Sequence, residues 1–282
     1  MTKYVFLAVV VTVIYFFQSF FLPTGGIGAD SLSYFGIASD LPQLKTNLFP
    51  LGFPVLIKIF HFIFQDYFWA GKILNISMVT MILLFSYVKK FYFRETVLLF
   101  AGKTFFFAFN LVISEGLFLF LLYFLFYLFY ERFQDKISSR HFVFYASAIL
   151  ILLFTVRYSG IYIYLGTGVF WLWMLLRRRI FAFQKDLLKV LVVSGAGIIA
   201  YLSFNYFVYG SFTGEHLRGA PARIYPVYVV RNILAMVNII DPFIGIKPAS
   251  NSFVSIAFQV GLMLIDLLLL RYFVKLVMRK NH

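Results

Sequence analysis

Residues 114–130 read SEGLFLFLLYFLFYLFY, a run whose one charged side chain, Glu115, stands near its start. A helix needs about 20 predominantly apolar residues to cross the hydrocarbon core of a bilayer. Similar apolar runs occur before and after this one in the chain. The stretch therefore predicts an all-α integral membrane protein.

Composition supports the same class. The chain has 282 residues, of which 62% are hydrophobic, 22% aromatic and 13% charged, whereas about a quarter of the residues in a soluble domain are charged. This balance excludes a cytosolic enzyme, a nucleic-acid-binding module and a disordered chain. The formal net charge of +14 is better explained by basic loops that face the cytoplasm than by a nucleic-acid partner. With no cysteine, disulfides, thiolate metal sites and a cysteine nucleophile are excluded.

The apolar runs predict about eight transmembrane helices and no soluble domain, so that residues 1–282 form a single transmembrane domain. Two longer stretches are rich in polar residues, proline and glycine, and we expect them to form a first and a second outer loop. These loops are 23–66 and 210–252. The predicted spans are 4–22, 67–88, 96–112, 114–130, 142–157, 159–176, 188–208 and 253–274.

Lysine and arginine fall mainly between alternate spans, for example at Lys89, Lys90 and 177–179. Such loops face the cytoplasm, so we expect both termini to be cytoplasmic and both long loops to lie on the opposite side. A span over 50–66 would reverse the position of the 177–179 cluster. The stretch Leu51–Phe64 is therefore predicted to be an amphipathic interfacial helix in the first outer loop.

Two acidic residues on the predicted outer side are candidate catalytic groups. Asp30 opens a short helical segment, and Tyr34 lies one turn later on the same face. Its carboxylate could complement the helix dipole or act as a general base at the bilayer surface. Glu115 begins a span on the same side and has the same two interpretations. The two acids could converge in one site.

Cations on the outer side suggest an anion site. Arg157 could place its charge at the interface while its stem stays in the bilayer, or its guanidinium could bind a phosphate. The second loop begins with glycine, serine and threonine and then His216, Arg218 and Arg223. That composition fits an anion cradle or a flexible polar loop.

Six fragments, taken in order, resemble the GT-C glycosyltransferases, which use polyprenyl-phosphate-linked sugars and include the protein O-mannosyltransferases and the aminoarabinose transferase. The chain departs from their pattern at Leu51 and Gly116, where the family has proline, and it has neither a C-terminal soluble domain nor a D-x-D pair. The fragments are GADSLSYFGIA (28–38), NLFPLGFPVLI (47–57), AGKILN (70–75), ISEGLFL (113–119), TVRYSG (155–160) and YGSFTG (209–214).

The resemblance implies a membrane glycosyltransferase that moves a sugar from a polyprenyl-phosphate donor to an acceptor hydroxyl. The acceptor would be a glycan, a lipid or a protein of the cell envelope, at the outer, periplasmic face of a bacterial inner membrane. Asp30 and Glu115 would be catalytic, and no cofactor is implied beyond a divalent metal that no D-x-D motif supports. The implied partners are membrane lipid and the lipid-linked sugar, and not nucleic acid. The substrate-binding residues would be Tyr34, Arg157, Tyr158, His216, Arg218 and Arg223.

Two other classes of function stay open. A transporter or flippase for lipid-linked substrates would need charged groups inside the membrane, and Lys103 and Asp266 lie near the centres of apolar runs. These two residues could equally form a buried ion pair or extend separately towards the interface. A non-catalytic subunit of an envelope-assembly complex would need none of the candidate site residues.

Overall fold

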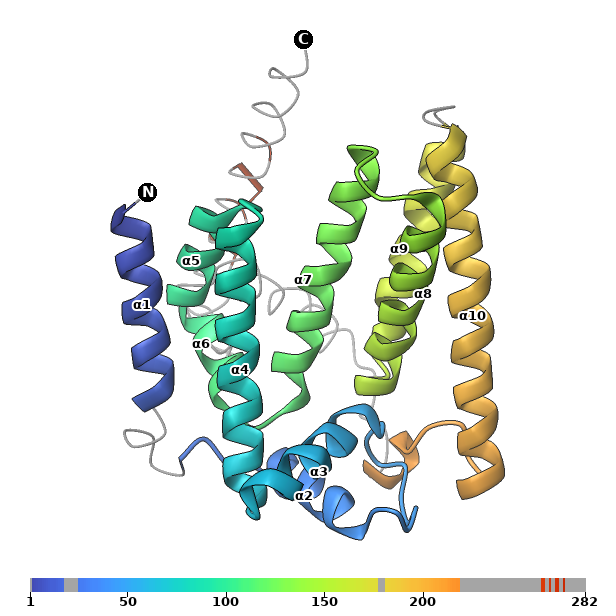
Figure 1. Cartoon of the computed structure of the whole chain (residues 1–282). Helices are drawn as coiled ribbons and strands as arrows, with labels where there is room; N and C mark the ends of the chain where they lie inside the picture. Colours follow the sequence, from blue (N-terminus) through green and yellow to red (C-terminus); the bar gives the residue numbers. More distant parts are fainter. Residues whose placement is uncertain are drawn as a thin grey trace. The chain divides into compact units, whose positions relative to one another are not determined.

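The computed structural model describes residues 2–17, 25–176 and 181–218, together with the helical positions 260, 261, 264, 267, 268 and 271. All secondary structure in these residues is helical (Figure 1). The helices are α1 (Thr2–Phe17), α2 (Ala29–Asp40), α3 (Gly52–Phe64), α4 (Tyr67–Val88), α5 (Phe93–Ala101), α6 (Lys103–Asn110), α7 (Ser114–Phe133), α8 (Ser139–Val156), α9 (Gly160–Leu176) and α10 (Phe181–Tyr209), followed by a 3₁₀ helix, Glu215–Arg218.

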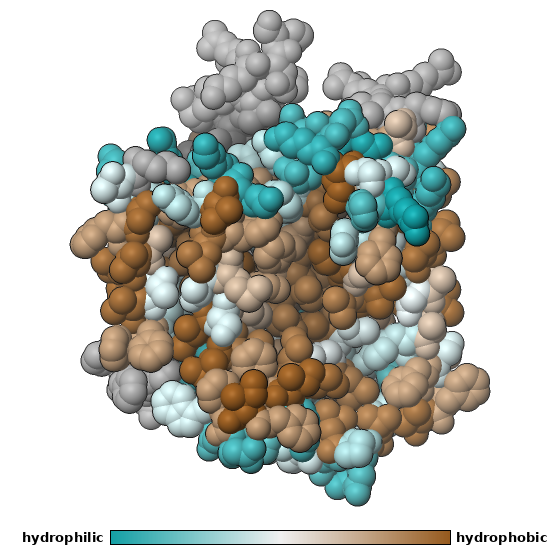
Figure 2. Space-filling model, in the orientation of Figure 1, coloured by the Kyte–Doolittle hydropathy of each residue, from teal (hydrophilic) through white to brown (hydrophobic). Residues whose placement is uncertain are grey.

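Four of these helices are long and apolar enough to cross a membrane: α4, α7, α8 and residues Ala182–Tyr209 of α10. Three more, α1, α3 and α9, are apolar but shorter. Figure 2 shows hydrophobic residues along the middle of the helices and hydrophilic residues towards their ends. The prediction of an α-helical protein with helices long and apolar enough to span a membrane is therefore confirmed for the described residues, while the count of eight spans stays a prediction.

The segment 96–112 differs from its prediction as one continuous helix. It contains most of α5, which has 9 residues, and α6, which has 8 residues. Gly102 separates them, and glycine has a lower helix propensity than any residue except proline. Each piece is much shorter than the about 20 residues that a single crossing requires, so the prediction of an uninterrupted span is wrong here.

The chain divides into two compact units. The first comprises Met1–Val97 and Ala108–Ala220, and the second comprises Leu98–Phe107 and Pro221–His282. In the second unit the rings of Phe100 and Phe105 meet edge to face, with centroids 5.2 Å apart. In the first unit, a core of fully buried side chains joins α7, α8, α9 and α10. It includes Leu125, Phe142, Ala146, Leu150, Leu153, Met174, Phe183, Leu187 and Val190.

Two short helices, α2 and α3, lie across one end of the long helices of the first unit (Figure 1). Helix α2 begins at the N-cap Gly28, whose backbone N–H donates to the Ser31 hydroxyl at 3.0 Å. In helix α3, Phe53 and Ile57 are fully buried while Phe62 is 70% exposed, so the helix is apolar on its packed face and also on part of its exposed face. Helix α4 begins beside them at Asp66, whose carboxylate accepts the Trp69 N–H at 2.9 Å. These caps fix where the chain enters and leaves this end of the bundle.

Candidate functional site

The hydroxyl of Ser114 joins three elements that lie far apart in the sequence. Ser114 is the first residue of α7 and is fully buried. Its Oγ lies 2.7 Å from the Tyr34 hydroxyl of α2 and accepts a hydrogen bond from Arg157 Nη1 at 3.3 Å. Arg157 ends α8 in an extended backbone conformation. The start of α7 therefore holds both the tyrosine and the arginine.

Arg157 also forms an ion pair with Glu115, between Nη1 and Oε1. The two side chains are 33% and 39% exposed, so the pair lies at the boundary of the protein. Glu115 Oε2 is buried and has no hydrogen-bond partner among the described residues. Because Nη1 makes both contacts, Nε and Nη2 of Arg157 have no partner in the described part of the chain. These N–H groups are available to an anion.

Asp30 lies in the first turn of α2 and is exposed. The N-cap position belongs to Gly28, and the Ser31 side chain satisfies the backbone there. Among the described residues, Asp30 forms neither a hydrogen bond nor an ion pair. Its charge still complements the positive end of the helix dipole, but capping does not occupy its oxygens, and they can accept a proton from a ligand.

A small polar cavity connects the carboxylate of Asp30 with the guanidinium of Arg157. Its volume is about 120 Å³. Pockets that enclose drug-sized ligands occupy about 300–1,000 Å³, so this cavity can enclose a small group such as a phosphate, and a larger ligand would extend out of it past the exposed Asp30. The residues that line it are Asp30, Tyr34, Phe49, Pro50, Arg157, Tyr158 and Ser159.

The two tyrosines of the cavity stay neutral at ordinary pH. Burial raises the pKa of Tyr34 to about 12, and burial also raises the pKa of Tyr158 above the usual tyrosine range. Both phenols can therefore donate or accept a hydrogen bond without adding charge. The charged groups that line the cavity are then one carboxylate and one guanidinium.

Amide side chains fix Tyr158 and the loop that precedes α3. The Tyr158 hydroxyl donates to the Asn47 carbonyl at 3.1 Å and accepts from Asn205 Nδ2 at 3.2 Å. Asn47 Nδ2 in turn donates to the Ser211 carbonyl at 3.1 Å. At Gly52, a Cβ atom would lie 2.7 Å from the Thr155 carbonyl oxygen, so glycine permits the start of α3 to approach the end of α8. This approach places Pro50 in the cavity wall.

The turn before Ser114 is held from α4. Lys72, which is 1% exposed, donates to the Asn110 carbonyl, and Asn75 Nδ2 donates to the Leu111 carbonyl at 2.8 Å. The ammonium lies at the C-terminal end of α6, where its charge complements the helix dipole. The position of the Ser114–Glu115 pair thus depends on two polar side chains of α4, a helix long and apolar enough to cross a membrane.

The structure brings some of the predicted site residues together in one cavity and leaves others outside it. Asp30, Tyr34, Arg157 and Tyr158 line one cavity, and Glu115 contacts it through Arg157. His216 is exposed in the 3₁₀ helix and is not among the residues that line the cavity.

Several other candidates cannot be placed. The side chain of Arg218, and Arg223 as a whole, lie outside the described residues. The same holds for the side chain of Lys103 and for Asp266, so their pairing stays a prediction.

Ser114, Asn47 and Asn205 are part of the site although sequence reasoning did not select them. Asn205 could have been found, because an amide inside a predicted span is costly unless it has a hydrogen-bond partner. Ser114 could have been suspected from its place beside Glu115 between two apolar runs. No spacing pattern indicates Asn47, since its partners Tyr158 and Ser211 are 111 and 164 residues away.

The donor set does not fit a divalent cation. The carboxylate that lines the cavity is that of Asp30, and it faces a guanidinium rather than a second acid. Glu115, the other nearby carboxylate, is paired with that guanidinium. Within the described residues, no group of three or more histidine, aspartate or glutamate side chains could hold a metal ion. The chemistry of the cavity instead suits an anion beside Arg157 and a proton donor beside Asp30.

Comparison with family models, with curated proteins and with solved structures found no match for this chain.

Proposed function

We propose that this protein is a membrane glycosyltransferase that moves a sugar from a polyprenyl-phosphate donor to an acceptor hydroxyl. One observation carries the proposal: the Asp30 carboxylate and the Arg157 guanidinium line the same small cavity, with Glu115 bound to the guanidinium. A base and a phosphate-binding group that line one cavity are what such a transfer requires.

In the proposed reaction the acceptor oxygen attacks the anomeric carbon and Asp30 takes the acceptor's proton. The bond between that carbon and the phosphate oxygen breaks, and its electron pair leaves with the polyprenyl phosphate. Nε and Nη2 of Arg157 stabilise the charge that develops on this phosphate. Glu115 orients the guanidinium through Nη1. Attack opposite the leaving phosphate inverts the configuration of the sugar.

The proposed topology puts this cavity on the non-cytoplasmic side, at the periplasmic face of a bacterial inner membrane. Lys89 follows α4, Arg132 lies in the last turn of α7 and Arg140 lies in the first turn of α8, all at the opposite end of the first unit (Figure 1). Loops rich in lysine and arginine face the cytoplasm. Helices α2 and α3 would then lie along the outer interface, with the exposed apolar face of α3 against lipid.

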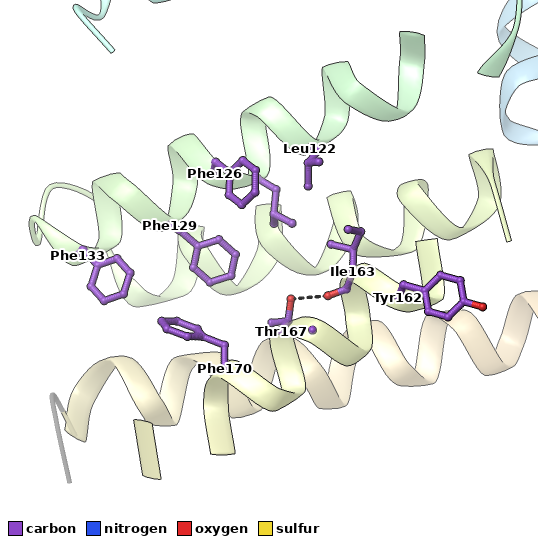
Figure 3. A pocket seen from close by; sticks show the side chains of 10 residues that line it. Leu122, Phe126, Phe129, Phe133, Tyr162, Ile163, Thr167 and Phe170 are labelled. Carbon is purple, nitrogen blue, oxygen red and sulfur yellow. Dashed lines mark hydrogen bonds between the residues drawn. The ribbon is translucent and has the colours of Figure 1, made fainter. Parts of the chain in front are cut away.

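An apolar cavity of about 390 Å³ offers a place for the donor's lipid chain. Figure 3 shows Phe126 and Phe129 of α7 facing the same space as Thr167 and Phe170 of α9. Its lining includes Tyr162, in the first turn of α9, three residues after Ser159 in the polar cavity. If the donor's phosphate lies beside Arg157, its lipid chain could therefore extend between α7 and α9.

Two glycines of α9 provide a matched test of whether the lipid chain occupies this apolar cavity. A Cβ atom at Gly166 or Gly168 would meet no atom within 4 Å, and of the two only Gly166 lines the apolar cavity. We expect Gly166→Leu to raise the KM for a long-chain donor about tenfold, since a leucine side chain removes space along the chain's path. Gly168→Leu should change the KM less than twofold. Equal KM values for the two variants would contradict the placement of the chain.

The proposed function is tested with the purified protein in liposomes that contain labelled polyprenyl-phosphate sugars. We expect label to move to an acceptor and free polyprenyl phosphate to appear in equal amount. If the labelled lipid instead crosses the bilayer with its sugar attached, the protein is a transporter. If neither transfer nor crossing occurs with any donor, the assembly-subunit alternative is favoured.

A further inference from the structure

A second groove, formed by residues of α8 and α10, combines a basic end with an apolar wall. Its volume is about 1120 Å³, above the about 1,000 Å³ typical of the largest ligand pockets. Arg140, His141 and Lys189 line one end of it, and apolar residues such as Phe144, Ile151 and Val193 line the rest. None of these residues takes part in the proposed sugar transfer.

The basic end of the groove carries positive charge that the described residues do not neutralise. Arg140 is exposed and has no hydrogen bond or ion pair with the described residues. The Lys189 side chain is 63% exposed, and its ammonium is 4.0 Å from Asp186. The negative charge of Asp186 is already neutralised by Arg132, whose Nε donates to its carboxylate at 2.9 Å. The Ser139 hydroxyl also donates to this carboxylate. The described residues that line the groove include no acid.

From its basic end to its far end, the groove has about the length of one leaflet. Arg140 and Ile151 are eleven positions apart on α8, which corresponds to about 16 Å along a helix. The hydrocarbon core of a bilayer is about 30 Å thick, so the groove extends through about half of it. At its far end, a Cβ on Gly197 would meet the Ile151 side chain. The close approach of α8 and α10 at this point closes the groove.

We propose that this groove is a binding site for one anionic phospholipid, with the phosphate head beside Arg140 and Lys189 and the acyl chains along Phe144, Ile151 and Val193. Both helices are long and apolar enough to cross the membrane, so the apolar wall faces hydrocarbon and the cations face the head groups. Basic pockets between transmembrane helices bind anionic head groups in this way. The N-terminal end of α8 adds a partial positive charge.

The proposal is tested by native mass spectrometry of the full chain, titrated with dioleoylphosphatidylglycerol or dioleoylphosphatidylcholine. We expect the anionic lipid to bind at least tenfold more tightly. One cation near an anionic head group contributes about fivefold in affinity, so Arg140→Gln with Lys189→Gln should weaken binding of the anionic lipid about 25-fold. Binding of the zwitterionic lipid should stay the same.

Two further variants separate this site from general charge effects and from misfolding. Lys89→Gln with Lys136→Gln removes two exposed cations from the same end of the first unit, neither of which lines the groove; binding should change less than twofold. Ala148→Trp fills the apolar part and should weaken binding of both lipids. Thermal unfolding in lipid-free detergent checks that all variants fold. Equal affinity of the wild type for both lipids, or an equal loss in the Lys89/Lys136 variant, would overturn the proposal.

Discussion

Asp30→Asn is expected to lower the rate of sugar transfer by about 10²–10⁴-fold, the usual contribution of a general base. The asparagine amide has nearly the shape of the carboxylate but cannot take the acceptor's proton. Asp30 is exposed and has no hydrogen-bond or ion-pair partner among the described residues, so the substitution should leave the fold intact. The measurement is the initial rate with a labelled polyprenyl-phosphate sugar.

A second aspartate on the same helix is the control for this prediction. Asp40 ends α2, lies outside the polar cavity and pairs with Lys45 at 2.9 Å. Exposed ion pairs contribute about 0–1 kcal/mol, so Asp40→Asn should retain more than half of the wild-type rate. Full activity of the Asp30 variant, or equal losses in the two variants, would end the assignment of Asp30 as the base.

Arg157→Gln is expected to lower kcat by about 10²–10³-fold, as the loss of one charge-stabilising donor does in other enzymes. Glutamine would remove the positive charge opposite the departing phosphate and leave the Glu115 carboxylate without its ion-pair partner. The donor's KM should rise as well, because in the proposed mechanism the guanidinium binds the phosphate before reaction. Steady-state kinetics with varied donor concentration separates the two effects.

Because Arg157 pairs with Glu115, the effects of replacing Glu115 alone and together with Arg157 can also be predicted. Glu115→Gln alone should cost less than Arg157→Gln, since the arginine keeps its bond to Ser114. Combined, the two substitutions should cost clearly less than the product of the single effects, because residues in contact are not additive. Lys45→Gln, which removes another cation at the same end of the first unit, is the control for the loss of positive charge. Strictly multiplicative losses would show that Glu115 does not act through Arg157.

Much of the helical fold could be predicted from the sequence, because apolar runs and their polar ends mark the spans. The predicted span 67–88 coincides with α4, which begins after the N-cap Asp66. The span 159–176 differs from α9 by one residue. The interruption at Gly102 was missed, since hydropathy alone is insensitive to a local break in the helix.

The candidate site was only partly predictable. Helical spacing places Asp30 and Tyr34 one turn apart on one face, and the side of the membrane limits which acids and cations can meet. No local pattern indicates that Ser114 lies between Tyr34 and Arg157, because these contacts connect residues 80 and 43 positions apart. The contacts of Lys72 with the turn before α7 are equally non-local.

The absence of cysteine from the chain permits a direct test of where the cavity opens and what it binds. Ser159 lines the cavity, and Ser159→Cys would introduce a single thiol there. Gln134→Cys, an exposed position at the other end of α7, is the control. Labelling uses a membrane-impermeant maleimide applied to each side of sealed vesicles, with and without added polyprenyl phosphate.

We expect the thiol at position 159 to react from the non-cytoplasmic side and polyprenyl phosphate to slow this reaction, whereas the thiol at 134 should react from the cytoplasmic side at an unchanged rate. Labelling of position 159 from the cytoplasmic side, or at the same rate with and without polyprenyl phosphate, would contradict a lipid-phosphate site between Asp30 and Arg157.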